Sequence, residues 1–383
     1  MKLLILTQKI DKNDDVLGFM HGWIAEFARY CEKVTVIALE VHEYDLPRNV
    51  RIFSLGKENI SQKSTQLNKK VKRVKKVYKV ESKLKYLFNF YRYIWSERNN
   101  YDNVFVHMNP EYVVMGGLFW RLTRKKIGMW YMHKSVNLKL RIAEKLTNEV
   151  FSGTQESFRL KTKKLNITGH GIDIDKFKVS PVKFNSLTGQ ESQESKVADG
   201  FRIVTIGRIS SIKDYGTLID AMEVLQKSGL NIKLDILGDA DSSDDKKYLE
   251  SLIQKVKDKG LEEKINFVGS VPNKDIVNYL HQADIFVNTS QTGSLDKAIL
   301  EAMACGLVVL SSNDSSRNIF GGYRDRLFFK PKDSEDLARK ISRITKLSSG
   351  ERIEIGKKLR ETVVKDHNLE DLIKKIIRIY QKR

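Results

Sequence analysis

The residues with the clearest capacity for chemistry lie in one stretch, Asn288 to Ser312. An apolar run that ends at Asn288 predicts a buried strand, a loop of small residues follows at Thr292-Gly293-Ser294, and Lys297 to Ala304 has a helical pattern. A second β-rich run after this helix completes the strand, loop, helix and strand of a βαβ unit. The free N–H groups where such a helix begins form a site for a phosphate. Glu301, one turn further on, is a carboxylate that can bind sugar hydroxyls beside that anion.

Two cations, Arg208 and Lys213, lie five residues apart on a single loop, directly after an apolar strand that ends in Gly207. An arginine fork and a lysine point charge together suit a diphosphate, and the helix start near Ser294 would complete the site. Each cation alone could equally be a surface residue of a basic protein. Their position after a strand-end glycine favours a role in binding.

Three histidines, His107, His133 and His170, fall near predicted strand ends. For His107 we favour a hydrogen-bonded structural residue. His133 closes an apolar run directly before a Lys-Ser turn, so its ring is expected to face the binding crevice. Contact with a ligand and a structural role are equally well supported for His133.

The elements that hold these residues in place alternate along both halves of the chain. In the first half, strands are expected at Leu3–Thr7, Val34–Leu39, Val50–Ser54, Val104–His107, Ile127–His133 and Val150–Ser152, with helices at Phe19–Tyr30, Glu111–Leu122 and Leu138–Leu146. In the second half, strands at Phe201–Ile206, Lys233–Leu237 and Ile265–Val268 and helices at Thr217–Gln226, Lys246–Lys257 and Lys274–Ala283 precede the Asn288 stretch. This alternation predicts two doubly wound parallel sheets, whose ligands bind beyond the carboxyl ends of the strands. The loops Gln8–Gly18, Met108–Glu111 and His133–Asn137 are therefore the candidate binding loops of the first half.

The totals are consistent with a two-domain protein that has an anionic partner. At 383 residues the chain is too long for one ordinary domain. Lysine and arginine outnumber acidic residues 68 to 48, which gives a net charge of +20 and favours nucleic acid, an anionic membrane or phosphorylated ligands. The two cysteines, Cys31 and Cys305, are expected to be buried thiols of a reducing compartment. No targeting segment or membrane span is visible, so we expect a cytoplasmic protein that is soluble or peripheral on the inner membrane face.

The most biased segment is Lys69 to Lys85, which holds nine basic residues against a single acid, Glu81. Apolar residues recur every three or four positions, which predicts one buried helical stripe with lysines on the opposite face. These positions are Val71, Val74, Val77, Leu84, Leu87/Phe88, Tyr91 and Trp95. A solvated face of a core helix is the ordinary interpretation. Binding to an anionic membrane is the favoured functional one, because aromatics on a buried stripe are poorly placed to stack on nucleic-acid bases.

Other motifs are absent from the sequence. No G-x-G-x-x-G opens either half and no G-x-x-x-x-G-K-[ST] is present, which argues against a dinucleotide cofactor and a P-loop hydrolase. No Asp-x-Asp-type cluster follows a strand, and the acidic run at Asp241, Asp244 and Asp245 is expected to be a solvated helix start. We therefore expect no cofactor and no metal. The polar stretch Asn185–Gly200 is predicted to be a linker or flexible loop.

Several segments, in order along the chain, resemble the retaining glycosyltransferases of family 4, which have the GT-B fold. The segments are His170-Gly171-Ile-Asp173, Gly207-Arg208-Ile-Ser-Ser-Ile-Lys213, Leu237-Gly238-Asp239, Phe267-Val-Gly-Ser-Val-Pro272 and Leu300-Glu301-Ala-Met-Ala-Cys-Gly306. The resemblance implies two Rossmann-like domains that face a cleft. With it we expect an N-terminal acceptor-side domain over 1–172, a linker over 173–200 and a nucleotide-sugar domain over 201–355. Residues 356–383 are expected to form a C-terminal helix that crosses back to the first domain.

The resemblance also implies a role for each matching residue. Arg208 and Lys213 would bind the diphosphate of a nucleoside-diphosphate sugar, and Glu301 would bind the ribose hydroxyls. The loop Thr292, Gly293, Ser294 and Leu295 would meet phosphates and sugar through backbone amides, and the turn holding Gly269 and Val271 would flank the base. Gly18 and His133 would contribute from the acceptor side. One departure is clear: the family's first glutamate is replaced by Gly293, while Asp296 stands where a glycine is common.

The expected function is metal-independent transfer of a hexose, with retention, to a glycan or lipid-linked acceptor. His133 would contact the donor sugar or the backbone near the reacting carbon. The competing class is a basic protein that binds nucleic acid or membrane without catalysis. A GT-B-type epimerase or phosphorylase ranks last, because no lysine has an obvious cofactor pocket.

Overall fold

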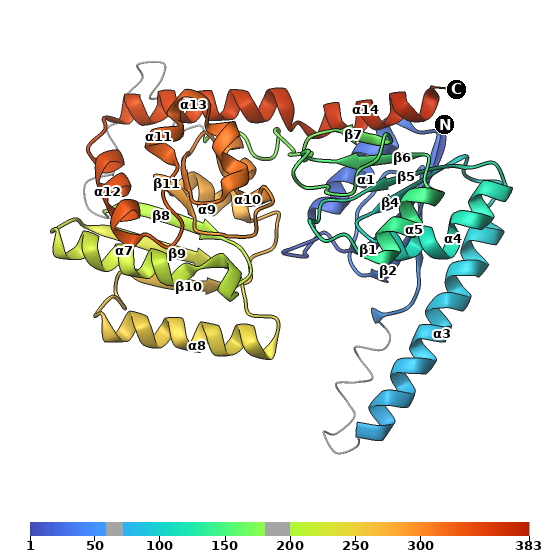
Figure 1. The fold of residues 1–383 in the computed structure, drawn as a ribbon, viewed down its shortest axis with the longest axis horizontal. Helices are drawn as coiled ribbons and strands as arrows, with labels where there is room; N and C mark the ends of the chain where they lie inside the picture. Colours follow the sequence, from blue (N-terminus) through green and yellow to red (C-terminus); the bar gives the residue numbers. More distant parts are fainter. Residues whose placement is uncertain (59–71, 181–199, 383) are drawn as a thin grey trace. The chain divides into compact units, whose positions relative to one another are not determined.

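The computed structural model describes residues 1–58, 72–180 and 200–382, and the side chains of 72–82 are outside this description. The chain forms two compact units (Figure 1). Unit 1 comprises Met1–Gly171 and Leu369–Arg383, and unit 2 comprises Ile172–Asn368. Most of the predicted linker, Asn185–Gly200, lies outside the described residues; Gly200 is described.

Unit 1 contains a seven-stranded sheet in the order β3-β2-β1-β4-β5-β6-β7, and every neighbouring pair is parallel. The strands are β1 (Lys2–Ile10), β2 (Lys33–Val41), β3 (Val50–Ser54), β4 (Asn103–His107), β5 (Lys126–Trp130), β6 (Glu149–Ser152) and β7 (Leu165–Ile167). Helices α1 (Phe19–Tyr30) and α14 (Leu369–Gln381) share one apolar cluster with the sheet. Helices α3 (Lys72–Ser96), α4 (Pro110–Leu122) and α5 (Leu138–Leu146) share the other. The sheet is thus covered by helices on both faces.

Unit 2 repeats this architecture with a five-stranded parallel sheet in the order β10-β9-β8-β11-β12. The strands are β8 (Phe201–Ile206), β9 (Ile232–Leu237), β10 (Ile265–Gly269), β11 (Ile285–Asn288) and β12 (Val308–Ser311). The helices are η1 (Ser211–Lys213), α7 (Tyr215–Lys227), α8 (Ser243–Asp258), α9 (Ile276–Gln282), α10 (Lys297–Ala304), η2 (Asp314–Tyr323), α11 (Arg324–Leu327), α12 (Ser334–Thr345) and α13 (Ser349–Asp366). The prediction of two Rossmann-like parallel α/β domains is confirmed.

The end of the chain is divided between the two units. Helix α13 belongs to unit 2, where Arg360 donates hydrogen bonds to the carbonyl oxygens of Phe177 (2.8 Å) and Ile174 (3.2 Å). Helix α14 belongs to unit 1, where the Tyr380 hydroxyl donates to the carbonyl of Val104 at 2.8 Å. The segment 356–383, expected to be one crossing helix, is therefore two helices that separate at Asn368. Residues 172–180 likewise pack in unit 2, because Phe177 is part of its core.

Helix α3 corrects the predicted burial of its aromatic stripe. Leu84, Leu87, Phe88, Tyr91 and Trp95 are exposed by 38% to 66%. The residues that α3 packs against the sheet are Phe90 and Ile94 instead. The helix carries two apolar stripes, and one sheet face can bury only one of them. The lysines at 69 and 70 lie outside the described residues.

Two smaller predictions can be compared with the structure. Cys31 and Cys305 are buried, as expected, and burial raises the pKa of the Cys31 thiol to about 11. Among the described residues, none of the helices has the length and apolar character needed to cross a bilayer.

Candidate functional site

The loops at the carboxyl end of the unit 2 sheet are joined by backbone hydrogen bonds. Gly207 N–H donates to Leu237 at 2.9 Å, and Gly238 N–H donates to Gly269 at 2.8 Å. Gly238 has φ +140°, and a Cβ at this position would overlap the carbonyl oxygen of Gly207. Only glycine allows the two strand ends to approach this closely. The predicted strand-end residues Gly207 and Gly269 therefore lie on either side of the β9 strand end, and each is hydrogen-bonded to it.

Lys213 lies at the end of η1, against the loop that joins β11 to α10. The Thr289 hydroxyl donates to the carbonyl of Lys213 at 2.6 Å, and Gln291 N–H donates to that of Ile212 at 2.9 Å. The Lys213 amine forms an ion pair of 2.8 Å with Asp296, and these side chains are only 17% and 13% exposed. The structure thus brings Lys213 to the predicted phosphate loop, with Asp296 as its counter-ion.

Arg208 is placed differently. Its side chain is 54% exposed, and its nearest acidic group is Asp241 at 4.0 Å. An exposed guanidinium with one distant partner is available to an incoming anion. The neighbouring acids behave as predicted for a helix start, because Asp245 and Ser242 form the capping box of α8.

The loop Thr292 to Leu295 is held from several sides. The Asn313 amide donates to the carbonyl of Ser294 at 2.7 Å, and the Ser315 hydroxyl donates to that of Gly293. Gly293 has φ +68°, in the left-handed region that favours glycine, and Leu295 is buried. This backbone conformation gives a local reason for a glycine at position 293, where the family that the sequence resembles has a glutamate.

Asp296 is the residue of this loop that the sequence reasoning noted without giving it a role. Asn288 donates to its carboxylate at 3.0 Å, and the Thr292 hydroxyl lies 3.4 Å from its other oxygen. Asp296 is also the N-cap position of α10, although its side chain caps no N–H group. The sequence did contain a signal for this residue, because an aspartate stands beside the predicted phosphate loop at a position where a glycine is common.

Glu301 is buried on α10, with a relative exposure of 3%. Burial raises the pKa of its carboxyl group, and the charges of Lys297 and Lys176 act in the opposite direction. Asn273 hydrogen-bonds this carboxylate and also accepts from Lys176 at 2.6 Å. The oxygen Oε1 is buried without a hydrogen-bond partner among the described residues. An acceptor in this state is suited to a hydroxyl group of a ligand.

Lys297 and Lys176 were missed by the sequence reasoning. Lys297 precedes Glu301 by four residues, the spacing that places two side chains on one helix face, so this contact could have been found. Burial lowers the pKa of Lys297 to about 8, against the raising effect of Glu301. Lys176 comes from a segment far away in sequence and gave no local signal.

Val271, the residue predicted to flank the base, is partly buried and packs against the apolar core of unit 2.

The predicted acceptor-side residues, Gly18 and His133, belong to unit 1. Gly18 is the N-cap residue of α1. His133 is exposed after β5, and its Nδ1 lies 2.8 Å from the Ser135 hydroxyl and 3.1 Å from the Ser135 N–H. His107 is a core residue, as expected, because its ring stacks on Trp130 with the centroids 5.4 Å apart.

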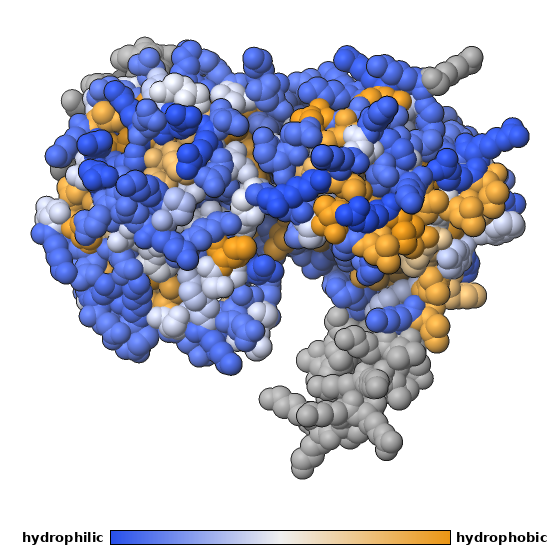
Figure 2. Space-filling view, in the orientation of Figure 1, coloured by the Kyte–Doolittle hydropathy of each residue, from blue (hydrophilic) through white to orange (hydrophobic). Residues whose placement is uncertain are grey.

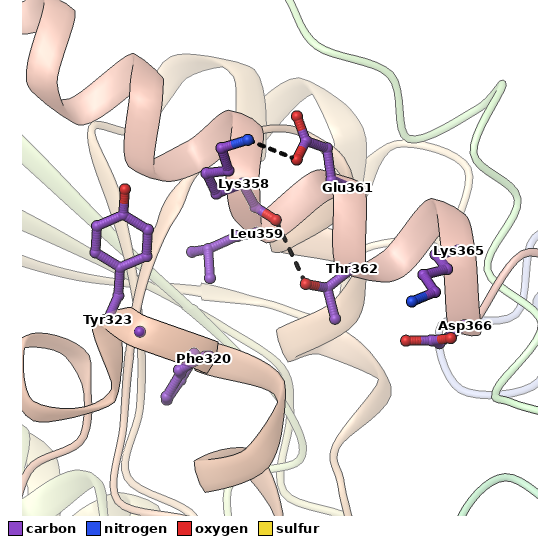
Figure 3. A pocket seen from close by; sticks show the side chains of 10 residues that line it. Phe320, Tyr323, Lys358, Leu359, Glu361, Thr362, Lys365 and Asp366 are labelled. Carbon is purple, nitrogen blue, oxygen red and sulfur yellow. Dashed lines mark hydrogen bonds and ion pairs between the residues drawn. The ribbon is translucent and has the colours of Figure 1, made fainter.

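A cavity of about 560 Å³ in unit 2 involves none of the predicted site residues. It lies between η2 and α13 (Figure 3), where Lys358 and Glu361 form an ion pair of 3.0 Å. Its lining includes Phe320, Tyr323 and Leu359 besides this ion pair, and it has neither the strand-end glycines nor the buried carboxylate predicted for the site, so we do not place the site there. Within the described residues, no group of three or more His, Cys, Asp or Glu side chains could hold a metal ion.

Comparison with known proteins finds sequence similarity in the second half of the chain. Residues 189–362 match the family model "Glycosyl transferases group 1". Mannosylfructose-phosphate synthase of Agrobacterium fabrum (strain C58 / ATCC 33970) is 31% identical over 186 residues, which is 48% of this chain and 40% of that protein. The human GDP-Man:Man(3)GlcNAc(2)-PP-Dol alpha-1,2-mannosyltransferase is 25% identical over 178 residues, 44% of this chain and 36% of that protein. The chain thus matches about two fifths or less of the length of these curated relatives.

The fold extends the similarity to the whole chain. Anabaena HepE, solved in complex with UDP, superposes with a TM-score of 0.72 at 18% identity and 100% coverage of both chains. The sucrose-phosphate synthase of Thermosynechococcus elongatus also superposes with a TM-score of 0.72, at 17% identity, over 100% of this chain and 99% of that one. These structures have the GT-B fold. The protein is therefore similar to the group 1 glycosyltransferases in sequence over 189–362, and it has their two-unit fold throughout.

Proposed function

We propose that this protein is a glycosyltransferase that moves a hexose from a nucleoside-diphosphate sugar to an acceptor hydroxyl, with retention of configuration and without a metal. The carrying observation is that Arg208 and Lys213 follow β8 and Glu301 lies on α10, which follows the neighbouring strand β11, while Lys213 is paired with Asp296 directly after the Thr292–Leu295 loop. Two cations that suit a diphosphate lie at the carboxyl end of the unit 2 sheet. The helix α10 adds a buried carboxylate that has one oxygen without a hydrogen-bond partner among the described residues.

Each group has a distinct task in the proposed reaction. The bond between the anomeric carbon and the diphosphate oxygen breaks, the acceptor oxygen bonds to the same face, and its proton passes to the departing phosphate. Arg208 and Lys213 stabilise the negative charge that develops on the leaving group. Stabilisation of the transition state by such preorganised charges is usually the largest single contribution to catalysis. Glu301 accepts hydrogen bonds from the ribose hydroxyls, Gly269 and Val271 flank the base, and no protein nucleophile is needed.

His133 and Gly18 are proposed to contribute from the acceptor-side unit, His133 near the reacting carbon. A ring held at Nδ1 by Ser135 has its other nitrogen available for a substrate oxygen. Retention of configuration and the identity of the transferred sugar are the most specific parts of the proposal. Since Gly293 supplies no carboxylate, the sugar hydroxyls must be bound by groups other than the family's first glutamate.

A glycan or lipid-linked acceptor is proposed, and with it a peripheral position on the cytoplasmic membrane face. The name of the human relative gives a PP-Dol-linked glycan as its acceptor, which supports a lipid-linked class. The basic segment Lys69–Lys85 adds charge that suits an anionic surface.

The decisive experiment is a thermal-shift screen against UDP, GDP, ADP and their sugars, followed by a transfer assay with the best donor in the presence and absence of EDTA. A bound nucleotide raises stability in proportion to ln(1 + [L]/Kd), so the base is identified directly. Arg208→Ala and Lys213→Ala should each reduce turnover about tenfold or more, as for loss of a preorganised charge. Lys227→Ala, which removes an exposed cation of α7 paired with Glu223, is the matched control.

Unchanged rates in both site variants would refute the assignment. Salt-dependent binding of nucleic acid without any turnover of nucleotide sugars would instead favour a basic binding protein.

A further inference from the structure

Unit 1 has an exposed apolar surface, for which the proposed function has not yet given a role. It consists of Leu84, Leu87, Phe88, Tyr91 and Trp95 on α3, Leu118 and Leu122 on α4, and Leu138 and Ile142 on α5. We name this set the apolar face. Of the 14 large apolar side chains that are exposed in the described part of the chain, nine belong to it. Figure 2 shows apolar residues gathered over these helices, whereas much of the remaining surface in that view is hydrophilic.

The three helices form one continuous surface. The Tyr91 hydroxyl donates to the Met115 carbonyl at 3.1 Å, and the rings of Trp95 and Phe119 lie 5.8 Å apart, so α3 contacts α4. Arg121 of α4 donates to the carbonyl of Lys145 at the end of α5 at 3.0 Å. Single exposed leucines are ordinary, but a contiguous set of this size marks an interaction surface.

The charges among these apolar residues have one predominant sign. From Lys83 onward, α3 carries Lys83, Lys85 and Arg92 and no acid. Helices α4 and α5 add Arg121, Lys139, Arg141 and Lys145 against two glutamates. Both glutamates have basic partners, Glu111 with Lys139 at 2.9 Å and Glu144 with Lys164 at 3.5 Å. The surface is therefore apolar with a cationic surround.

We propose that the apolar face docks on an anionic lipid bilayer. Its leucines would enter the boundary between headgroups and acyl chains, Tyr91 and Trp95 would lie at headgroup level, and the lysines and arginines would contact lipid phosphates. A second copy of the chain is a poor occupant, because it would bring the same positive charge. Nucleic acid is also a poor occupant, because most of the apolar side chains are aliphatic and offer no ring for stacking.

This inference deepens the proposed function, since it names the surface that would bring a lipid-linked acceptor to the enzyme. It differs from the sequence-based expectation, in which the lysines of Lys69–Lys85 bind and the aromatic stripe is buried. Here the exposed stripe itself is the binding element. It also includes α4 and α5, which the sequence reasoning did not connect with a membrane.

The test is co-sedimentation of the full chain with vesicles of phosphatidylcholine, with and without phosphatidylglycerol, at low and high salt. The apolar variant Phe88→Ser/Trp95→Ser/Leu118→Ser/Leu122→Ser should lose roughly tenfold or more of its partitioning to the anionic vesicles. The matched control Ile167→Ser/Ile253→Ser changes exposed residues outside the face and should partition like the wild type. The charge variant Lys83→Gln/Lys85→Gln/Arg141→Gln should lose mainly the salt-sensitive part of the binding.

Nucleotide binding, followed by thermal shift, separates this inference from the proposed activity. The apolar variant should keep the wild-type shift, because its substitutions are in unit 1 and the proposed donor site is in unit 2. No sedimentation of the wild type, or equal sedimentation of the wild type and the apolar variant, would overturn the inference. So would a change of oligomeric state or of nucleic-acid binding in the apolar variant without any binding to vesicles.

Discussion

The two units share a strand order around their first strand, β2-β1-β4 in one and β9-β8-β11 in the other, but the lysines near the ends of these first strands have different kinds of partner. In unit 1, Lys9 near the end of β1 forms an ion pair of 2.6 Å with Asp14, which is on the loop that directly follows this strand. In unit 2, Lys213 forms its ion pair of 2.8 Å with Asp296, which is on the loop after β11. The first pair neutralises charge locally, whereas the second joins two loops at a helix start.

The carboxylates differ in the same way. Hydrogen bonds from Leu17 and Val16 N–H and the ion pair with Lys9 hold the pKa of Asp14 below its usual value, despite the opposing effect of burial. Glu301 of unit 2 has the reverse balance, because its burial raises its pKa and one oxygen is unpartnered. A satisfied acid stabilises a loop, and an unsatisfied one is available to a ligand. This difference supports the proposal that the donor binds to unit 2.

The largest expected effect separates the two lysines. Lys213→Ala should weaken binding of the nucleoside diphosphate identified by the screen about 10- to 100-fold, as for loss of a hydrogen-bonded charge contact. Lys9→Ala should leave the dissociation constant unchanged within error. Isothermal titration calorimetry of both variants measures this directly, and equal effects would remove the distinction between the two units.

Glu301→Ala should weaken the same ligand about tenfold, because a buried acceptor for two hydroxyls is lost. It should also destabilise unit 2, since Lys297 and Lys176 lose their counter-charge. Glu301→Gln preserves the shape and isolates the effect of the charge on binding. The idea fails if both variants bind the nucleoside diphosphate like the wild type.

Asp296→Asn should have a smaller effect of opposite sign. Asp296 competes with phosphate for the Lys213 amine, so its neutral isostere should tighten diphosphate binding by roughly three- to tenfold. Asn288→Ala, which removes the neighbouring donor and leaves both charges in place, is the control. Weaker binding by Asp296→Asn would show that the carboxylate positions Lys213 and does not compete for it.

The smallest effect concerns backbone conformation. Gly293→Ala should cost about 1 kcal/mol of unfolding free energy, because φ +68° is unfavourable for a residue with a Cβ. Gly22→Ala on α1 should instead add about 0.5 kcal/mol, since it is helical and a Cβ there meets nothing within 4 Å. Urea denaturation of the pair measures both signs. Equal stability of the two variants would mean that the turn accepts other residues.

The alternation of apolar strands and helices, and the glycines at strand ends, determined by themselves that the chain forms two parallel α/β units with binding loops at the carboxyl ends. These signals are local, because backbone propensity and burial act over a few residues. Arg208, Lys213 and Glu301 could be found in the same way, from their positions after or within such elements.

Only the tertiary structure decided which partners these residues have. Lys213 and Asp296 are 83 residues apart, and Lys176, Asn273 and Glu301 come from separate segments, so nothing in their local sequence joins them. The same holds for α3, where periodicity predicted one buried stripe that includes Phe88 and Trp95, whereas the structure exposes this stripe and buries one with Phe90 and Ile94. Which stripe is buried depends on how the helix docks on its sheet. That contact is made by side chains distant in sequence, so it is settled by packing and not by periodicity.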